Sequence, residues 1–283
     1  MKKNYLKYIS ALILFGLNGI VASSIALSSY EIVMLRTFIG SILLLILFLL
    51  MKNKFTFYKH KKSFVFLIIS GIAMGASWMF LYEAYQEIGV SLASIEYYCG
   101  PVIVMILSPI IFKEKLTYKK ILGFICVVAG ILLVDGQEIG NIDKKFGIFC
   151  GAMSAVMYAF MVIGNKKAKE IKGFENALLQ LIISFITVAI FVIIKQGLYI
   201  HVQGGDWCNI LVLGLLNTGI GCYLYFTSIG GLPINTVAIL GYLEPLSAVV
   251  FSAVFLSEMM TSIQILGACM ILGGAMFSEL SSE

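Results

Sequence analysis

The feature that most constrains this chain is a succession of apolar runs separated by short polar links. An α-helix needs about 20 apolar residues to cross the roughly 30 Å hydrocarbon core of a bilayer. The runs are continuous rather than alternating, which argues against a membrane β-barrel. The sequence therefore predicts an all-α integral membrane protein with ten transmembrane helices. The ten segments are 6–27, 32–51, 63–83, 90–112, 117–134, 146–164, 175–194, 207–229, 234–256 and 261–279.

Composition excludes the main soluble classes. The 283 residues are 60% hydrophobic and 12% charged, whereas a soluble domain carries about 25% charged residues. The net charge of +5 lies in the links between the runs, so it gives no reason to expect a nucleic-acid partner. The six cysteines are scattered without CxxC spacing, and no GxxxxGK[ST] motif occurs. We therefore expect no disulfide framework, no metal site, no cofactor and no direct use of ATP.

The distribution of lysine predicts the orientation in the membrane, because cytoplasmic loops carry an excess of basic residues. With the N-terminus inside, sixteen of the twenty basic residues fall in cytoplasmic links. Only three, Lys144, Lys145 and Lys195, fall outside, and Arg36 lies within the second run. The sequence therefore predicts a multi-pass protein of the plasma membrane with both termini cytoplasmic.

An internal repeat organises the chain. A shift of 144 residues aligns two stretches without a gap over 56 residues. The matches include proline, glutamate, threonine and glycine, which chance alignment of apolar helices rarely produces. The matched pairs are Gly75 and Gly219, Tyr98 and Tyr242, Pro101 and Pro245, Ser108 and Ser252, Glu114 and Glu258, Thr117 and Thr261, Gly123 and Gly267, and Gly130 and Gly274.

The length of the repeat predicts its topology. Each copy holds five runs, residues 1–144 and 145–283, and five is odd. The second copy must therefore enter the membrane from the opposite side to the first. Two inverted five-helix repeats are typical of alternating-access transporters, with the substrate held near the midplane between the repeats.

Each repeat ends in the same pattern: a proline, a glutamate 13 residues later, and a glycine nine residues after that. Pro101, Glu114 and Gly123 form it in the first repeat, and 245–267 repeats it in the second. With residues 15–18 (Phe-Gly-Leu-Asn), this resembles the EamA family of the drug/metabolite transporter superfamily. The resemblance implies a secondary transporter, often an exporter, of amino acids, amines or other small metabolites. The chain departs from the family pattern at Glu96, and it has Gln180 where the register places Arg36.

Two carboxylates lie in the runs away from their ends, where ionisable groups cost about 2.5–3.5 kcal/mol on insertion scales and are usually functional or paired. Glu96 lies about one turn before Pro101, and Glu244 immediately precedes Pro245. Glu244 corresponds to Gly100, four residues after Glu96, so we expect the two carboxylates on equivalent helix faces, flanking a central cavity. We expect Glu96 to couple transport to protons or to bind a substrate amine. Glu244 has an equally good interpretation as a structural acceptor.

Arg36 is the other intramembrane charge. It can grip a substrate carboxylate, pair with Glu31, or extend to the outer headgroups. Aromatic side chains around the carboxylates suit an ammonium group, and amides at membrane depth can bind substrate or join helices. The candidate substrate-binding residues are therefore Glu96, Glu244, Arg36, Trp78, Tyr82, Tyr97, Tyr98, Tyr158, Tyr242, Asn18 and Asn217.

Other residues have structural interpretations. Glu114 and Glu258 are expected to cap helices or anchor loops. The glycines of the fifth and tenth runs, Gly123, Gly130, Gly267 and Gly274, are expected to pack helices or to form a dimer surface, so the chain is a monomer or a homodimer.

These observations together predict a non-enzymatic, secondary active transporter that exports small amine-containing metabolites, either amino acids or organic cations. A nucleotide-sugar or other metabolite carrier of the same superfamily is the alternative within transport. A membrane enzyme and a sensor are the alternatives outside it.

Overall fold

The structure is a computed structural model that describes residues 2–113, 117–135, 144–197, 200–229, 232 and 240–280. Glu114 and residues 234–239 of the ninth predicted run lie outside the described residues. The described part is helical and contains no strand. Its α-helices are α1 (Lys2–Gly16), α2 (Asn18–Ser23), α3 (Ser29–Leu50), α4 (Lys61–Ile88), α5 (Val90–Tyr97), α6 (Gly100–Phe112), α7 (Tyr118–Asp135), α8 (Lys145–Lys167), α9 (Gly173–Gln196), α10 (Trp207–Leu211), α11 (Gly221–Ile229), α13 (Leu243–Phe251) and α14 (Ser262–Leu280). Two π-helices, η4 (Val212–Ile220) and η5 (Ser252–Leu256), and two 3-10 turns, η1 (Phe57–Lys59) and η3 (Gly204–Asp206), complete them.

Seven helical stretches in the described residues are long and apolar enough to cross a membrane. Three shorter apolar helices accompany them: Ile121–Val134, Leu243–Leu256 and Ser262–Phe277. The all-helical membrane architecture is thus confirmed, while the count of ten spans stays a prediction. The seven long stretches are Lys2–Ser23, Ser29–Leu50, Lys61–Ile88, Val90–Phe112, Lys145–Lys167, Gly173–Gln196 and Gly204–Tyr225.

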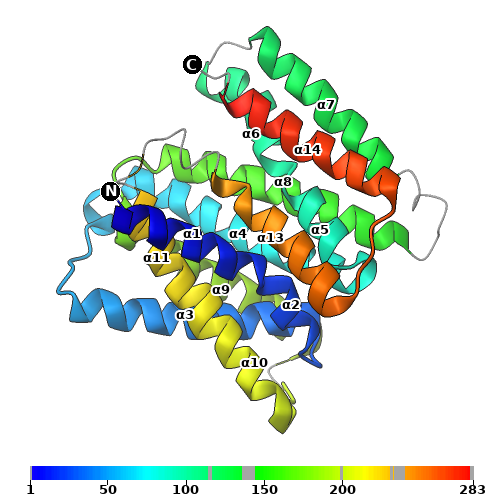
Figure 1. Cartoon of the computed structure of the whole chain (residues 1–283). Helices are drawn as coiled ribbons and strands as arrows, with labels where there is room; N and C mark the ends of the chain where they lie inside the picture. The colour runs from blue at the N-terminus through cyan, green and yellow to red at the C-terminus, as the bar shows by residue number, and fades with distance from the viewer. Residues whose placement is uncertain are drawn as a thin grey trace.

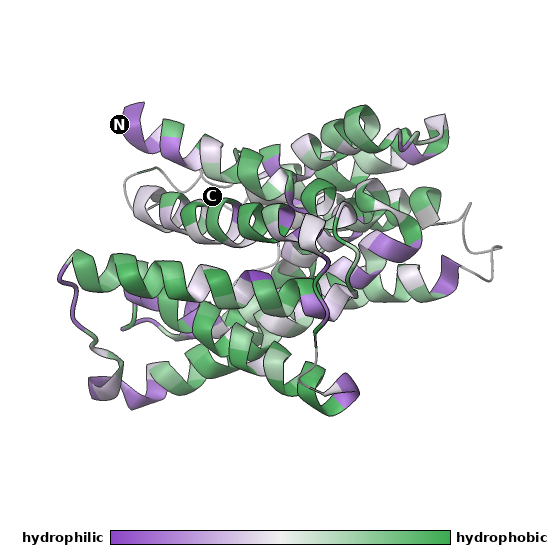
Figure 2. Cartoon of the chain, turned by 90° about the horizontal axis from the view of Figure 1, so that it is seen from below, coloured by the Kyte–Doolittle hydropathy of each residue, from purple (hydrophilic) through white to green (hydrophobic). Residues whose placement is uncertain are grey.

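The outer surface of the bundle is apolar. The helices are predominantly hydrophobic along their length, and hydrophilic residues concentrate at helix ends and in the links (Figure 2). Ile194 and Ile110 are 81% and 78% exposed, which in water would be unfavourable and in lipid is not. Several polar side chains, by contrast, are buried between helices.

Helix packing follows the sequence repeat. The 144-residue shift carries α1 onto α8, α3 onto α9, and α7 onto α14. Two of these equivalent pairs, α3 with α9 and α7 with α14, pack against each other. The contact of α4 with α8 likewise has its counterpart in the contact of α1 with α11. The packing of one half of the bundle is therefore echoed by the other.

The α7–α14 pair shows this relation most closely. The two helices lie side by side at one edge of the bundle (Figure 1). A Cβ on Gly130 would lie 2.7 Å from the carbonyl oxygen of Gly267, and a Cβ on Gly267 would lie 2.7 Å from the carbonyl oxygen of Gly130. Because only glycine permits so close an approach, these residues pack the two helices together. Cys126 also donates to the carbonyl of Met270, its own equivalent, at 3.4 Å.

The end of the second half caps a helix of the first. The Glu258 carboxylate accepts hydrogen bonds from the backbone N–H groups of Val90 and Ser91, both at 2.9 Å. These donors have no partner within α5, since the first turn of a helix leaves its N–H groups unpaired. The hydroxyl groups of Ser91 and Ser252 also pair. The expected capping role of Glu258 is confirmed.

Candidate functional site

The helices break where the sequence places proline beside the candidate residues. α5 ends at Tyr97 and α6 starts at Gly100, with Pro101 in its first turn. Proline has no N–H to donate, so it fits the first turn of a new helix better than the middle of a continuous one. Pro245 occupies the first turn of α13 in the same way. Such breaks are tolerated at membrane depth where a helix lines a cavity or packs inside protein.

Arg36 forms the centre of the site. Its side chain extends from α3 into the bundle and is only 2% exposed. Its Nε donates to the Thr218 hydroxyl at 2.9 Å, and its Nη1 donates to the Tyr82 hydroxyl. The guanidinium carbon lies 4.7 Å from the ring centroid of Trp78 and 5.0 Å from that of Tyr82. Arg36 of α3 is thus held by α4 of the first half and by η4 of the second.

Two of the three expectations for Arg36 are wrong. A buried side chain does not extend to the headgroups. Nor does Glu31 pair with it, because the Glu31 carboxylate accepts from the backbone N–H and hydroxyl of Ser28 in a capping box at the start of α3. The spacing of Glu31 three residues after Ser28 is the usual one for such a box. Binding of a substrate carboxylate stays as the prediction for Arg36.

Trp78 and Tyr82 lie together, as their i, i+4 spacing predicts. Their faces, however, already hold the Arg36 guanidinium. Arg36 therefore makes the cation–π contact with these rings that was expected for a substrate ammonium. In this conformation the two aromatic residues therefore position Arg36. The negative charge that would bind a substrate amine must come from another residue.

Glu244 supplies that charge from the second half. It lies in the first turn of α13, where Tyr98 is its hydrogen-bonding partner and Arg36 is a charged neighbour. Tyr97 is an electrostatic neighbour of both Glu244 and Arg36. The structure thus brings together a cation from the first repeat and an anion from the second.

Tyrosines surround this pair of charges. The ring centroid of Tyr97 lies 5.1 Å from that of Tyr158 and 5.5 Å from that of Tyr98, both edge-on. Tyr97 is also a hydrogen-bonding partner of Trp78. Tyr242 is buried directly before α13. These side chains form an aromatic wall rather than a separate cage.

A π-helix carries the polar contribution of the second half. Thr218 lies in η4, and its hydroxyl donates to the carbonyl of Leu213, five residues earlier, at 2.8 Å. π-Helical segments within longer helices are frequent at functional sites. The neighbouring Asn217 is 1% exposed, and its Nδ2 has no hydrogen-bond partner among the described residues. The Oδ1 of Asn18, at the start of α2, is also buried without a hydrogen-bond partner among the described residues. Both amides retain an unused polar atom for a ligand.

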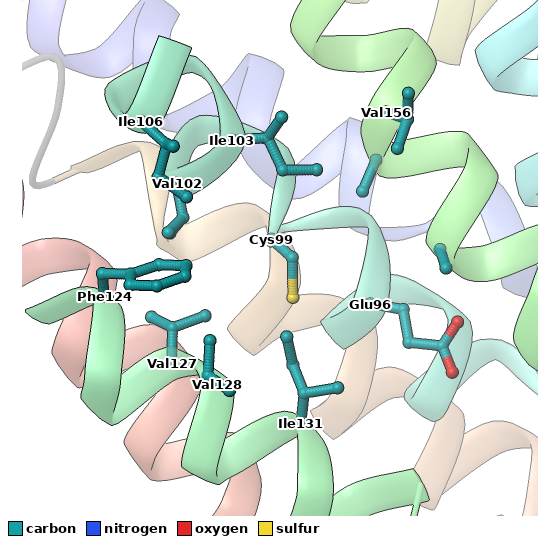
Figure 3. Close-up of a pocket in the computed structure, with 12 residues that line it drawn as sticks. Glu96, Cys99, Val102, Ile103, Ile106, Phe124, Val127, Val128, Ile131 and Val156 are labelled. Atoms are coloured by element: carbon teal, nitrogen blue, oxygen red, sulfur yellow. The ribbon is translucent and has the colours of Figure 1, made fainter.

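Glu96 lies apart from this cluster. It is 4% exposed and points from α5 toward α8, where a Cβ on Gly151 would overlap its Oε2. Cys150 of α8 is one of its electrostatic neighbours. Glu96 also lines an apolar pocket together with residues of α6, α7 and α8 (Figure 3). The structure therefore does not place Glu96 and Glu244 in comparable surroundings, contrary to the expectation from their register.

Thr218 is a partner of Arg36 that was not predicted from the sequence. The two residues are 182 positions apart, and no local motif connects them. The available clue was physical: a lone buried arginine needs acceptors, and a hydroxyl at membrane depth in the other repeat is one of few candidates.

The chain forms a bundle of apolar helices from two repeats, with the ionisable side chains of Arg36 and Glu244 buried inside it. This is the architecture of a membrane transporter. The EamA-like transporter family matches residues 3–135 and 145–280, and the chain belongs to this family. The family consists of transporters rather than enzymes.

The chain is also similar to several named proteins. The chain is 25% identical to an uncharacterized transporter, YxxF, of Bacillus subtilis, over 95% of this chain and 87% of that protein. It is 26% identical to the threonine/homoserine exporter RhtA of Salmonella typhimurium, over 87% and 80%. It is 23% identical to human solute carrier family 35 member G1, over 75% and 61%. A crystal structure that is 16% identical matches the fold with a TM-score of 0.69, over 100% of this chain and 99% of that one.

Proposed function

We propose that this protein is a secondary active transporter that exports small amine-containing metabolites, amino acids or organic cations, by alternating access. The observation that carries the proposal is that Arg36 from one repeat and Glu244 from the other are electrostatic neighbours inside the bundle. A zwitterion can bind its carboxylate at Arg36 and its ammonium at Glu244, and an organic cation needs Glu244 alone. The name of RhtA, an amino-acid exporter, supports both the substrate class and the direction.

Alternating access needs a site that each half can close in turn. Since Arg36 and Glu244 belong to different halves, rocking one half against the other changes the geometry of the site. The Glu258 contact with α5 joins the halves at the end that the lysine distribution assigns to the outside. We propose that this contact holds the outer side closed in the present conformation.

The orientation that this mechanism assumes is a ten-span topology with inverted repeats and both termini cytoplasmic. It is supported by the lysine distribution. It is also supported by the reciprocal contacts of α7 and α14, in which Gly130 and Gly267 each approach the backbone carbonyl of the other. A cysteine replacing Ser262, in a background without the native cysteines, is expected to react with an impermeant maleimide added outside intact cells. Reaction only after the cytoplasm is opened would overturn the inverted topology.

Substrate class is tested by competition in proteoliposomes. We expect neutral amino acids and small organic amines to inhibit uptake of a labelled amino acid, and organic anions without an amine not to. In Glu244→Gln, inhibition by amines is expected to weaken by roughly tenfold to hundredfold, because a charge-assisted hydrogen bond contributes about 1.5–3 kcal/mol. Stronger inhibition by anions would favour Arg36 as the main determinant.

A nucleotide-sugar or other metabolite, which the resemblance to the wider superfamily implies, is the second candidate substrate. Such a ligand carries several negative charges. Arg36 is the only arginine in the sequence, and it faces Glu244, which repels anions. We therefore place this candidate second, and the anion arm of the same competition experiment decides between the two.

A further inference from the structure

Two polar segments, residues 51–62 and 166–172, lie side by side although they belong to different halves. The first runs from the end of α3 into the start of α4, and the second runs from the end of α8 to the start of α9. Glu175 of α9 accepts hydrogen bonds from the hydroxyl of Thr56 at 2.6 Å and from the backbone N–H of Phe57 at 2.9 Å. These contacts make one continuous surface of the two segments.

Glu170 joins the segments a second time. Its Oε2 lies 3.2 Å from Nδ1 of His60 and accepts from the hydroxyl of Ser63 at 3.1 Å. Leu67 of α4 and Ile171 of the second segment are also buried in the same apolar cluster. The polar contacts and this packing therefore hold the two backbones in a fixed relation to each other.

The combined surface is strongly basic. The two segments hold nine lysines and one carboxylate, that of Glu170. Their equivalents under the 144-residue shift, 195–206 and 22–28, hold one lysine, Lys195. The repeat therefore does not account for this charge. We call the nine lysines the basic surface, and all of them except the half-buried Lys167 are exposed: Lys52, Lys54, Lys59, Lys61, Lys62, Lys166, Lys167, Lys169 and Lys172.

The basic surface lies where the apolar outer surface of the bundle ends. Leu50 and Val65, on either side of the segment 51–62, are 73% and 55% exposed, as expected for residues that face hydrocarbon. Tyr58 is 59% exposed, and Nζ of Lys59 lies 5.7 Å from the centroid of its ring. Tyrosine is enriched at the membrane–water interface, and lysine side chains near helix ends extend to it. The ammonium groups are therefore at the level of lipid phosphates.

We propose that the basic surface binds the headgroups of anionic phospholipids, with one phosphate bridging lysines of the two segments. Clusters of about four to eight basic residues directly on the cytoplasmic side of a membrane helix attract anionic lipid. The lysine distribution assigns this end of the bundle to the cytoplasm. Because the segments belong to different halves, a bound headgroup joins the halves at this end, as the Glu258 carboxylate does at the other.

Lipid binding to the purified full-length protein in detergent tests the proposal, with native mass spectrometry as the readout. Phosphatidylglycerol and phosphatidylcholine with identical acyl chains are titrated separately. We expect phosphatidylglycerol to bind at least about tenfold more tightly, since each lysine near an anionic headgroup adds to the affinity. Glycerol 1-phosphate at the same concentration is expected not to displace it, because the acyl chains also hold the lipid beside the lysines.

Variants locate the preference on the surface. Lys61→Gln/Lys169→Gln removes one exposed lysine from each segment and is expected to reduce the preference for phosphatidylglycerol by at least about fivefold. Lys2→Gln/Lys3→Gln is the matched control, because it removes the same charge at the start of α1, outside the basic surface, and should keep the preference. Binding of phosphatidylcholine should be unchanged in both variants, which checks that they are folded. Lys54→Gln/Lys172→Gln is a second pair with the same expectation.

Equal affinity for the two lipids in the parent protein would overturn the proposal. An equal loss in Lys2→Gln/Lys3→Gln would also overturn it, because the preference would then follow net charge rather than this surface. Displacement of phosphatidylglycerol by glycerol 1-phosphate at equal concentration would show a site for soluble anions and would overturn the assignment to lipid.

Discussion

The two halves of the molecule have the same scaffold and different chemistry. α3 and α9 occupy equivalent places and pack against each other, yet one carries Arg36 where the other carries Gln180. Arg36 reaches the centre and is held by Trp78 and Tyr82 of its own half. The equivalents of those two residues are Cys222 and Phe226, which cannot hold a guanidinium in the same way.

Gln180 has a local role instead. Its Oε1 accepts from Nδ2 of Asn165, which also donates to Oδ1 of Asn176 at 2.9 Å. The three amides join α8 to α9, and Gln180 is 5% exposed. The comparison teaches that the repeat preserves backbone packing, while the site arises where the two copies have diverged. Each half contributes one charge to the centre, Arg36 and Glu244, from positions that are not equivalent.

The strongest way to break the asymmetry is Arg36→Gln, which gives the first half the residue of the second. The change removes the cation, its stacking on Trp78 and Tyr82, and one or both of its hydrogen bonds. Hydrogen bonds to charged groups contribute about 1.5–3 kcal/mol each, so we expect transport of amino acids to fall by more than about tenfold. Uptake into proteoliposomes, normalised to folded protein by size-exclusion chromatography, measures it.

Arg36→Lys serves as the control for charge alone. Lysine keeps the positive charge but lacks the planar fork that donates to Thr218 and Tyr82 together. We expect it to restore only part of the activity. Transport by Arg36→Gln at the parent rate would remove Arg36 from the site and leave it a structural residue.

An intermediate effect is expected for Glu258→Gln, which tests the contact between the halves. The amide has one oxygen in place of the two that accept from Val90 and Ser91, and it lacks the charge that favours a helix N-terminus. Loss of a helix cap costs about 0.5–2 kcal/mol, so the melting temperature is expected to fall by a few degrees. Met259→Ser at the adjacent, 86% exposed position is the matched control and should melt as the parent does. Equal melting of parent and Glu258→Gln would mean that the cap contributes nothing measurable.

Much of the fold could be predicted from the sequence because the bilayer imposes it. Apolar length specifies membrane helices, and the glycines of the fifth and tenth runs were expected to pack helices, which they do between α7 and α14. The capping role of Glu258 followed from its place beside Thr261 at a helix end. These features depend on local pattern or on the repeat, both of which are visible in a single sequence.

The arrangement of the site depends on helix rotation and on contacts over long separations. The register suggested that Glu96 and Glu244 share a face, but Glu96 turns toward Gly151 and Glu244 toward Tyr98. A break after α5 changes which direction each side chain takes, and no periodicity extends across it. The stacking of Arg36 on Trp78 and Tyr82 could not be predicted either. A sequence shows that cationic and aromatic side chains are present, but not which of them are in contact.

The smallest effect is expected for Gln180→Ala, which changes the residue of the second half that is equivalent to Arg36. The change removes one acceptor from Asn165, which retains Asn176 as a partner. A neutral hydrogen bond contributes about 0.5–1.5 kcal/mol, so stability should fall by no more than about that amount. Because the amides lie between α8 and α9 rather than at the Arg36–Glu244 pair, the affinity for substrate and its selectivity should be unchanged. Thermal melting and competition by amino acids on the same preparation measure the two quantities. If Gln180→Ala instead loses affinity as Arg36→Gln does, the two equivalent positions share a function, and the site is more symmetric than its contacts indicate.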